Sequence, residues 1–148
     1  MSELRTHAHA SADREVVWAV LVDHAAASGW MSGVVHSRLV TPGQDDRNGV
    51  GAVRVFLTMA GPVRERVTTF EPPGHLAYEM APDNPLVRDF RGVVRLREDA
   101  HGGGTDIDWV FRFEPRLRST RPVVERIVKL NTGRFASDLA GAAAERAR

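Results

Sequence analysis

The stretch that decides the fold class reads TDIDWVFRFE and spans residues 105–114. Two sets of side chains alternate along it, one apolar and one charged: Ile107, Trp109, Phe111 and Phe113, against Asp106, Asp108 and Arg112. A two-residue alternation is typical of a β-strand with one face buried and the other in water. The aromatic set is therefore expected to face an interior.

Segments of the same kind precede this stretch. Turn signals rich in Gly and Pro divide residues 34–114 into six strands, which we expect to be mostly antiparallel. The segment just upstream repeats the alternation, with Phe90, Gly92, Val94 and Leu96 opposite Arg91, Arg95 and Arg97. Its apolar set is expected to share the interior with the aromatic residues described above.

The two ends of the chain complete the pattern. Residues 6–11 alternate small and polar side chains, which predicts a first strand, and a helix capped by Ser11 or Asp13 follows, broken near Gly29 and Gly33. Near the other end, a helix is expected from Pro122 to about Ala144. Four residues spaced four positions apart form one stripe along it: Val123, Ile127, Asn131 and Phe135. Gly133 is expected to mark a kink or a close approach in this helix.

The order of elements predicts an α+β domain in which a curved, seven-stranded antiparallel sheet wraps around a long C-terminal helix, with two short helices after the first strand. The chain has 148 residues, 43% of them hydrophobic, which suits one domain over residues 1–148 with a real core.

Composition also excludes several classes of function. The chain has no Cys, so there is no thiolate nucleophile or Cys-ligated metal, and we expect no cofactor. The net charge of +1 lacks the basic excess that nucleic-acid binding needs. The longest apolar run, residues 16–22, is too short for a membrane span, and a cytoplasmic monomer or homodimer is expected.

Short motifs along almost the whole chain resemble the SRPBCC or START-like superfamily, and within it the polyketide cyclase/dehydrase-like branch. They are residues 10–18 (ASADREVVW), 49–54 (GVGAVR), 63–67 (VRERV), 75–78 (HLAY), 87–92 (VRDFRG) and 103–109 (GGTDIDW). The resemblance implies the helix-grip fold, with a ligand cavity between the sheet and the long helix.

A more local resemblance is to the plant abscisic acid receptors of the same superfamily, carried by residues 64–66 (RER), 87–92 and 128–131 (VKLN). It implies cavity positions for Glu65, Phe90 and Asn131, and less directly for Gly92, Val123 and Ile127. The chain differs from those receptors in the turn at residues 59–62 and in the loop at residues 84–86.

Arg54 and Glu65 are the candidate polar centre. A hairpin loop of even length between them would place both side chains on one face of the sheet, whereas an odd loop would place them on opposite faces. The family resemblance favours an arrangement in which both side chains point inward. Because burying a lone carboxylate costs several kcal/mol, an inward Glu65 needs a partner, and Arg54 is the nearest. The pair is either an anchor for a ligand carbonyl or hydroxyl, assisted by Tyr78, or a structural ion pair that stiffens the sheet.

Other residues have competing interpretations. Phe56 and Trp109 are expected among the apolar lining. Asn131 either lines the cavity or makes a helix-to-sheet hydrogen bond. His7 and His9 share one strand face, the spacing of a metal site, but their parity indicates the solvated face, so no metal is expected.

Three functions fit these features. A carrier or sensor could enclose a small hydrophobic molecule such as a polyketide, a lipid or an aromatic compound. A polyketide aromatase, cyclase or dehydratase could use the same cavity, with Glu65 as base, Tyr78 as acid and Arg54 steadying an enolate. A protein-interaction module with a filled interior is the third possibility.

Overall fold

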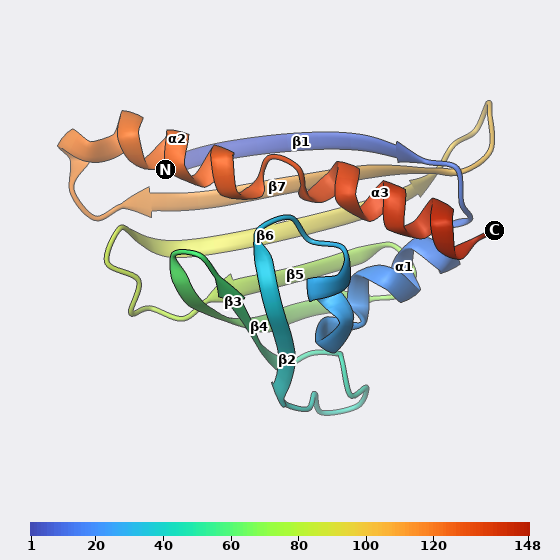
Figure 1. Cartoon of the computed structure of the whole chain (residues 1–148), viewed down its shortest axis with the longest axis horizontal. Helices are drawn as coiled ribbons and strands as arrows, with labels where there is room; N and C mark the ends of the chain where they lie inside the picture. The colour runs from blue at the N-terminus through green and yellow to red at the C-terminus, as the bar shows by residue number, and fades with distance from the viewer.

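The computed structural model describes residues 1–148, which form a seven-stranded sheet and a set of helices (Figure 1). In chain order the elements are β1 (Ser2–Ala10), α1 (Arg14–Val22), the 3₁₀ helix η1 (His24–Gly29), β2 (Val34–Thr41), β3 (Val53–Thr58), β4 (Gly61–Glu71), β5 (His75–Met80), β6 (Val87–Glu98), β7 (Thr105–Pro115), the 3₁₀ helix η2 (Arg118–Thr120), α2 (Arg121–Thr132) and α3 (Phe135–Arg146).

The sheet is antiparallel throughout, in the order β1-β7-β6-β5-β4-β3-β2. Strands β2 to β7 follow one another as hairpins, and β1 closes the order by pairing with β7, with Ala8 opposite Ile107. The predicted fold class, a helix-grip arrangement with seven strands, is confirmed.

The alternation in β6 and β7 places side chains as predicted. The aromatic and aliphatic set of β7 is buried, as are Phe90, Val94 and Leu96 of β6. A bulge between Arg88 and Arg91, where Asp89 has a φ of 53°, keeps both Val87 and Phe90 buried. A bulge inserts an extra residue into one strand, so it lets two inward positions stand three residues apart.

The predicted C-terminal helix is confirmed with one refinement. The helical run is divided into α2 and α3, and the break falls at Gly133 and Arg134, where the sequence predicts a kink. Gly133 still donates its N–H to the carbonyl of Lys129, at 2.8 Å, so α2 ends with a satisfied carbonyl.

The two helices pack differently. Helix α3 buries Ala136, Leu139, Ala140 and Ala143 against β1, β7 and α1, and its alanines allow a close approach. Helix α2 buries only Val124 and Val128. Space therefore remains between α2 and the inner face of the sheet. Neither helix, nor any other in the chain, combines the length and the apolar character that a membrane crossing requires.

Helix α3 should carry most of the stability of this end of the chain. Leu139→Ala removes a side chain with 0% exposure and should lower the free energy of unfolding by about 2–5 kcal/mol. Leu130→Ala, at a position with 74% exposure on α2, should change it by less than about 0.5 kcal/mol. Urea titrations of both variants test this, and equal losses would contradict it.

Candidate functional site

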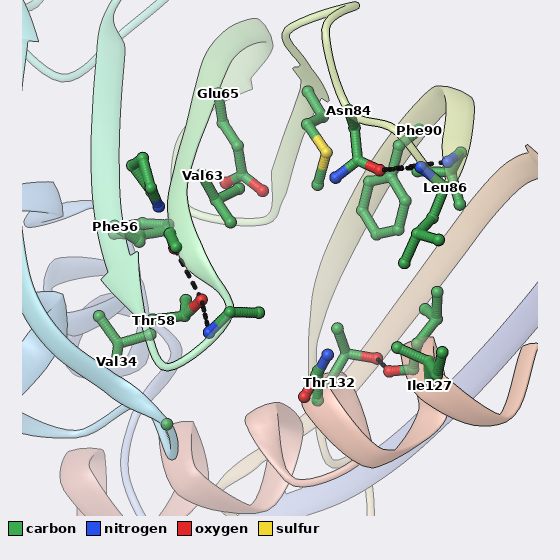
Figure 2. Close-up of a pocket in the computed structure, with 18 of the residues that line it drawn as sticks. Val34, Phe56, Thr58, Val63, Glu65, Asn84, Leu86, Phe90, Ile127 and Thr132 are labelled. Atoms are coloured by element: carbon green, nitrogen blue, oxygen red, sulfur yellow. Dashed lines mark hydrogen bonds between the residues drawn. The ribbon is translucent and has the colours of Figure 1, made fainter. Parts of the chain in front are cut away.

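A cavity of about 620 Å³ lies between α2, the β3–β4 hairpin, the β5–β6 loop and the inner face of the sheet. Sixteen of its 28 lining residues are hydrophobic, so its surface is mainly apolar. Figure 2 shows Phe56, Val63, Glu65 and Phe90 arranged around the open space, with Ile127 on the opposite side. The volume suits one small organic molecule.

Exposed lining residues identify the mouth of the cavity. Met59, at the tip of the β3–β4 hairpin, is 91% exposed, and Leu86, in the β5–β6 loop, is 46% exposed. Side chains brace both segments, as the dashed lines of Figure 2 show: Thr58 Oγ1 donates to the Gly61 carbonyl at 2.8 Å, and Asn84 Oδ1 accepts from the Leu86 N–H at 2.8 Å. These are the two segments in which the sequence differs from the abscisic acid receptors.

The structure brings six of the ten predicted ligand-binding residues to the wall of this cavity: Phe56, Glu65, Tyr78, Phe90, Ile127 and Asn131. Four others do not line this cavity: Arg54, Gly92, Trp109 and Val123. Their actual contacts explain why.

Arg54 lies beside Glu65 instead of lining the cavity. The two residues pair directly across β3 and β4, as expected for a hairpin that keeps them on one face. Arg54 donates from Nε at 3.1 Å and from Nη2 at 2.9 Å, both to Oε1 of Glu65. Because Oε2 accepts no hydrogen bond from the protein, this oxygen is the part of the pair that can meet a ligand.

His24, which the sequence analysis missed, completes the polar centre. Its exposure is 0%, and its Nδ1 accepts a hydrogen bond from Arg54 Nη1 at 2.9 Å. Nε2 must then carry the hydrogen, which it donates to the Asn48 carbonyl at 2.9 Å. Burial, and then the charge of Arg54, lower the pKa of His24 to about 3, so the ring is neutral. No local pattern signals a histidine 30 residues from its partner.

Two aromatic rings enclose the Arg54 guanidinium. Its central carbon lies 4.3 Å from the ring centroid of Tyr78 and 5.0 Å from that of Phe56. Such cation–π contacts stabilise a guanidinium that has left water. Burial raises the pKa of Glu65, and Arg54 opposes this shift. The carboxyl group therefore holds a proton more tightly than it would in water.

Gly92 and Trp109 position Tyr78. Gly92 pairs with Tyr78 across β5 and β6, and a Cβ at Gly92 would lie only 2.2 Å from Cζ of the tyrosine ring. The ring thus occupies the space above the glycine. Trp109 Nε1 donates to the Tyr78 hydroxyl oxygen at 3.0 Å. Burial raises the pKa of Tyr78, so the phenol keeps its proton.

Val123 and Asn131 show how α2 is oriented. Val123 is 62% exposed because the helix turns Val124 and Val128 inward. Asn131 borders the cavity, and its side chain makes no hydrogen bond to the protein. The alternative role, a helix-to-sheet hydrogen bond, is therefore not observed.

The histidines of β1 lie on the outer surface, away from the cavity. His7 and His9 are both exposed, as their parity predicts. His9 lies near Asp106, at 3.0 Å, and Asp99, at 3.7 Å, and these three side chains are close enough to share a metal ion. His9 and Asp106 are exposed, and the His9 ring nitrogen is within hydrogen-bond distance of Asp106, so we assign this cluster no metal role.

Burial of neutral His24 should make stability depend on pH. Its pKa is about 3 in the folded chain and about 6.5 when unfolded, so its contribution is complete above pH 6.5 and is lost as the pH falls toward 3. Between pH 7 and pH 4, His24→Gln should remove about 3 kcal/mol of the loss of unfolding free energy that acid causes in the wild type. Denaturant titrations from pH 7 to pH 4 test this. The exposed His36→Gln control should keep the wild-type slope, and an unchanged slope in His24→Gln would refute the assignment.

Gly92→Ala should displace the Tyr78 ring, because the added Cβ meets the ring and not a flexible end. We expect the Tyr78–Trp109 hydrogen bond to be lost, with a changed near-ultraviolet circular dichroism signal and a loss of about 1–3 kcal/mol in stability. Gly141→Ala, where nothing lies within 4 Å of the added methyl group, is the matched control and should be neutral or stabilising. Identical spectra for wild type and Gly92→Ala would contradict the placement of Tyr78.

Solved structures of other proteins share the fold of this chain. The Zhui aromatase/cyclase from Streptomyces sp. R1128 is 19% identical, with a TM-score of 0.83 over 99% of this chain and 96% of that one. A START superfamily protein from Mycobacterium smegmatis is 14% identical, with a TM-score of 0.70 over 98% and 96%. Ara h 8.0201 is 11% identical, with a TM-score of 0.74 over 96% and 97%. At these identities the likeness concerns the fold.

No curated protein sequence matches the chain. A family model does, and it covers residues 1–144. The shared fold, the apolar cavity and this match over nearly the whole length lead to one conclusion: the chain belongs to the family described as polyketide cyclase/dehydrase and lipid transport.

Proposed function

We propose that the protein is a carrier or sensor that encloses one small hydrophobic molecule, of polyketide, lipid or aromatic type, and holds its polar end at Glu65. In this proposal the whole chain is one ligand-binding domain, and it acts in the cytoplasm as a monomer or homodimer. The ligand enters past Met59 and Leu86, and its apolar body lies against Phe56, Phe90 and their neighbours.

The unpaired Oε2 of Glu65 carries the proposal. It is the free oxygen of a buried carboxyl group in a cavity whose walls are mainly apolar. A carboxylate oxygen in an ion pair only accepts hydrogen bonds, so the matching ligand group is a hydroxyl that donates its O–H to Oε2, and a hydrogen bond to a charged group contributes about 1.5–3 kcal/mol. Tyr78 on β5 and Asn131 on α2, at the opposite side of the cavity, are further polar residues among those that line it.

A polyketide aromatase, cyclase or dehydratase is the second candidate, favoured by the raised pKa of Glu65. In an aldol closure, Glu65 would take a proton from the carbon between two carbonyls. The resulting carbanion would form a carbon–carbon bond to a distant carbonyl, and Tyr78 would give its proton to that oxygen. Loss of water would follow. Arg54 does not line the cavity, so in this scheme its role is limited to positioning Glu65 and it does not contact the enolate.

Glu65→Gln should separate polar anchoring from apolar binding. Displacement of Nile red by 1-undecanol should weaken by roughly tenfold in this variant, because a charge-assisted hydrogen bond becomes a neutral one. Displacement by undecane, which has no polar end, should stay within about twofold. Unchanged displacement by 1-undecanol would remove Glu65 from the proposal, and failure of Nile red to bind wild type would remove the proposal itself.

Turnover distinguishes the carrier from the cyclase. If the protein is a cyclase, Glu65→Gln and Tyr78→Phe should each cut turnover of a short poly-β-keto substrate by roughly 10²–10⁴ while affinity for a product analogue stays within a few fold. If it is a carrier, both changes act through affinity alone. A wild-type product mixture identical to that in buffer would exclude the cyclase.

A further inference from the structure

The outer face of the sheet, opposite the cavity, carries a hollow of about 610 Å³. Register explains its shape. Ala77, Val93 and Val110 lie side by side on β5, β6 and β7 and form a floor of small apolar side chains. Two residues away on either side along β6 stand Arg91 and Arg95, roughly 13 Å apart along the strand. The hollow is thus a shallow trough with an apolar floor and walls of arginine.

Positive charge dominates this trough. Five arginines line it, Arg5, Arg91, Arg95, Arg97 and Arg112, against one carboxylate, Asp108. Arg91 stands directly opposite Arg112 on β7, where like charges destabilise a sheet, and its opposite neighbour on β5, Glu79, is paired with Arg66. A bound anion between Arg91 and Arg112 would relieve this repulsion.

The arginines on β6 are also free to bind an anion. Arg5 and Arg112 are engaged, since Arg5 Nη1 lies 2.8 Å from Asp108 and Arg112 Nε lies 3.3 Å from Glu3. Arg91 and Arg95, by contrast, take part in no ion pair or side-chain hydrogen bond, although Arg95 faces Asp108 in the register. In the single carboxylate of the trough, Oδ2 of Asp108 is paired with Arg5, whereas Oδ1 has no hydrogen-bond partner, and neither oxygen is paired with Arg91 or Arg95.

We propose that this trough is a second binding site, for a small molecule that carries a phosphate group next to an apolar body. Two guanidinium groups match the oxygens of a phosphate, which each can bind through paired N–H donors. Val93 and Val110 then support the apolar part of the same molecule. The site is on the opposite face from the cavity and does not depend on the function proposed for Glu65.

Phenyl phosphate and inorganic phosphate are suitable probes, titrated calorimetrically at constant ionic strength. Phenyl phosphate should bind wild type with a one-to-one stoichiometry and roughly tenfold or more tighter than inorganic phosphate, because only phenyl phosphate contacts the floor. The double variant R91Q/R95Q should weaken its binding at least roughly tenfold. Both arginines are exposed, so the variant should fold normally.

The matched control is R126Q/K129Q, which removes the same charge from exposed positions of α2. It should bind phenyl phosphate within about twofold of wild type. Equal losses in both double variants would reduce the effect to general electrostatics and overturn the proposal. Binding that survives in R91Q/R95Q would place the probe elsewhere, such as in the internal cavity, and would overturn it too. Nile red binding by R91Q/R95Q should be unchanged, which keeps this test separate from that of the cavity.

Discussion

The buried ion pair between Arg54 and Glu65 is the constraint around which the interior is arranged. Two charges taken out of water are tolerated only when each is paired and hydrogen-bonded. The β3–β4 register provides the pairing, His24 accepts a further guanidinium hydrogen, and the rings of Tyr78 and Phe56 enclose what remains. Four separate parts of the chain therefore meet at one guanidinium. One oxygen of the Glu65 carboxylate accepts no hydrogen bond from the protein, and Glu65 lines the apolar cavity.

That volume exists because the C-terminal helical run is divided. Helix α3 is rich in alanine and packs closely on β1 and α1, which anchors it. Helix α2 buries only two valines. The cavity lies between this helix and the sheet. A single helix packed along its whole length would have filled this space. The break at Gly133 therefore separates α3, which packs on the sheet and α1, from α2, which borders the cavity.

Because side chains alternate along β6, this strand presents apolar residues to the inner face of the sheet and arginines to the outer face. Phe90 and its inward neighbours belong to the core and the cavity, whereas Arg91 and Arg95 point outward into the trough. The bulge near Asp89 adds one residue to β6. Without it, the side chains before the bulge would point to the opposite face of the sheet. A shift of one residue in β6 would alter both sites at once.

The sequence by itself determined the order of the strands and the inward faces of residues 90–96 and 107–113, because these depend on neighbours two positions apart. It left open whether Arg54 and Glu65 share a face, which depends on the length of the hairpin loop between them. It also indicated the break at Gly133. Only the tertiary structure decided that His24 joins the polar centre, that Gly92 makes room for Tyr78, and that Val123 faces water. Those outcomes depend on how distant segments pack and how a helix is rotated about its axis, which local periodicity leaves open. The cavity volume belongs to the same class, since it is the space that packing does not fill.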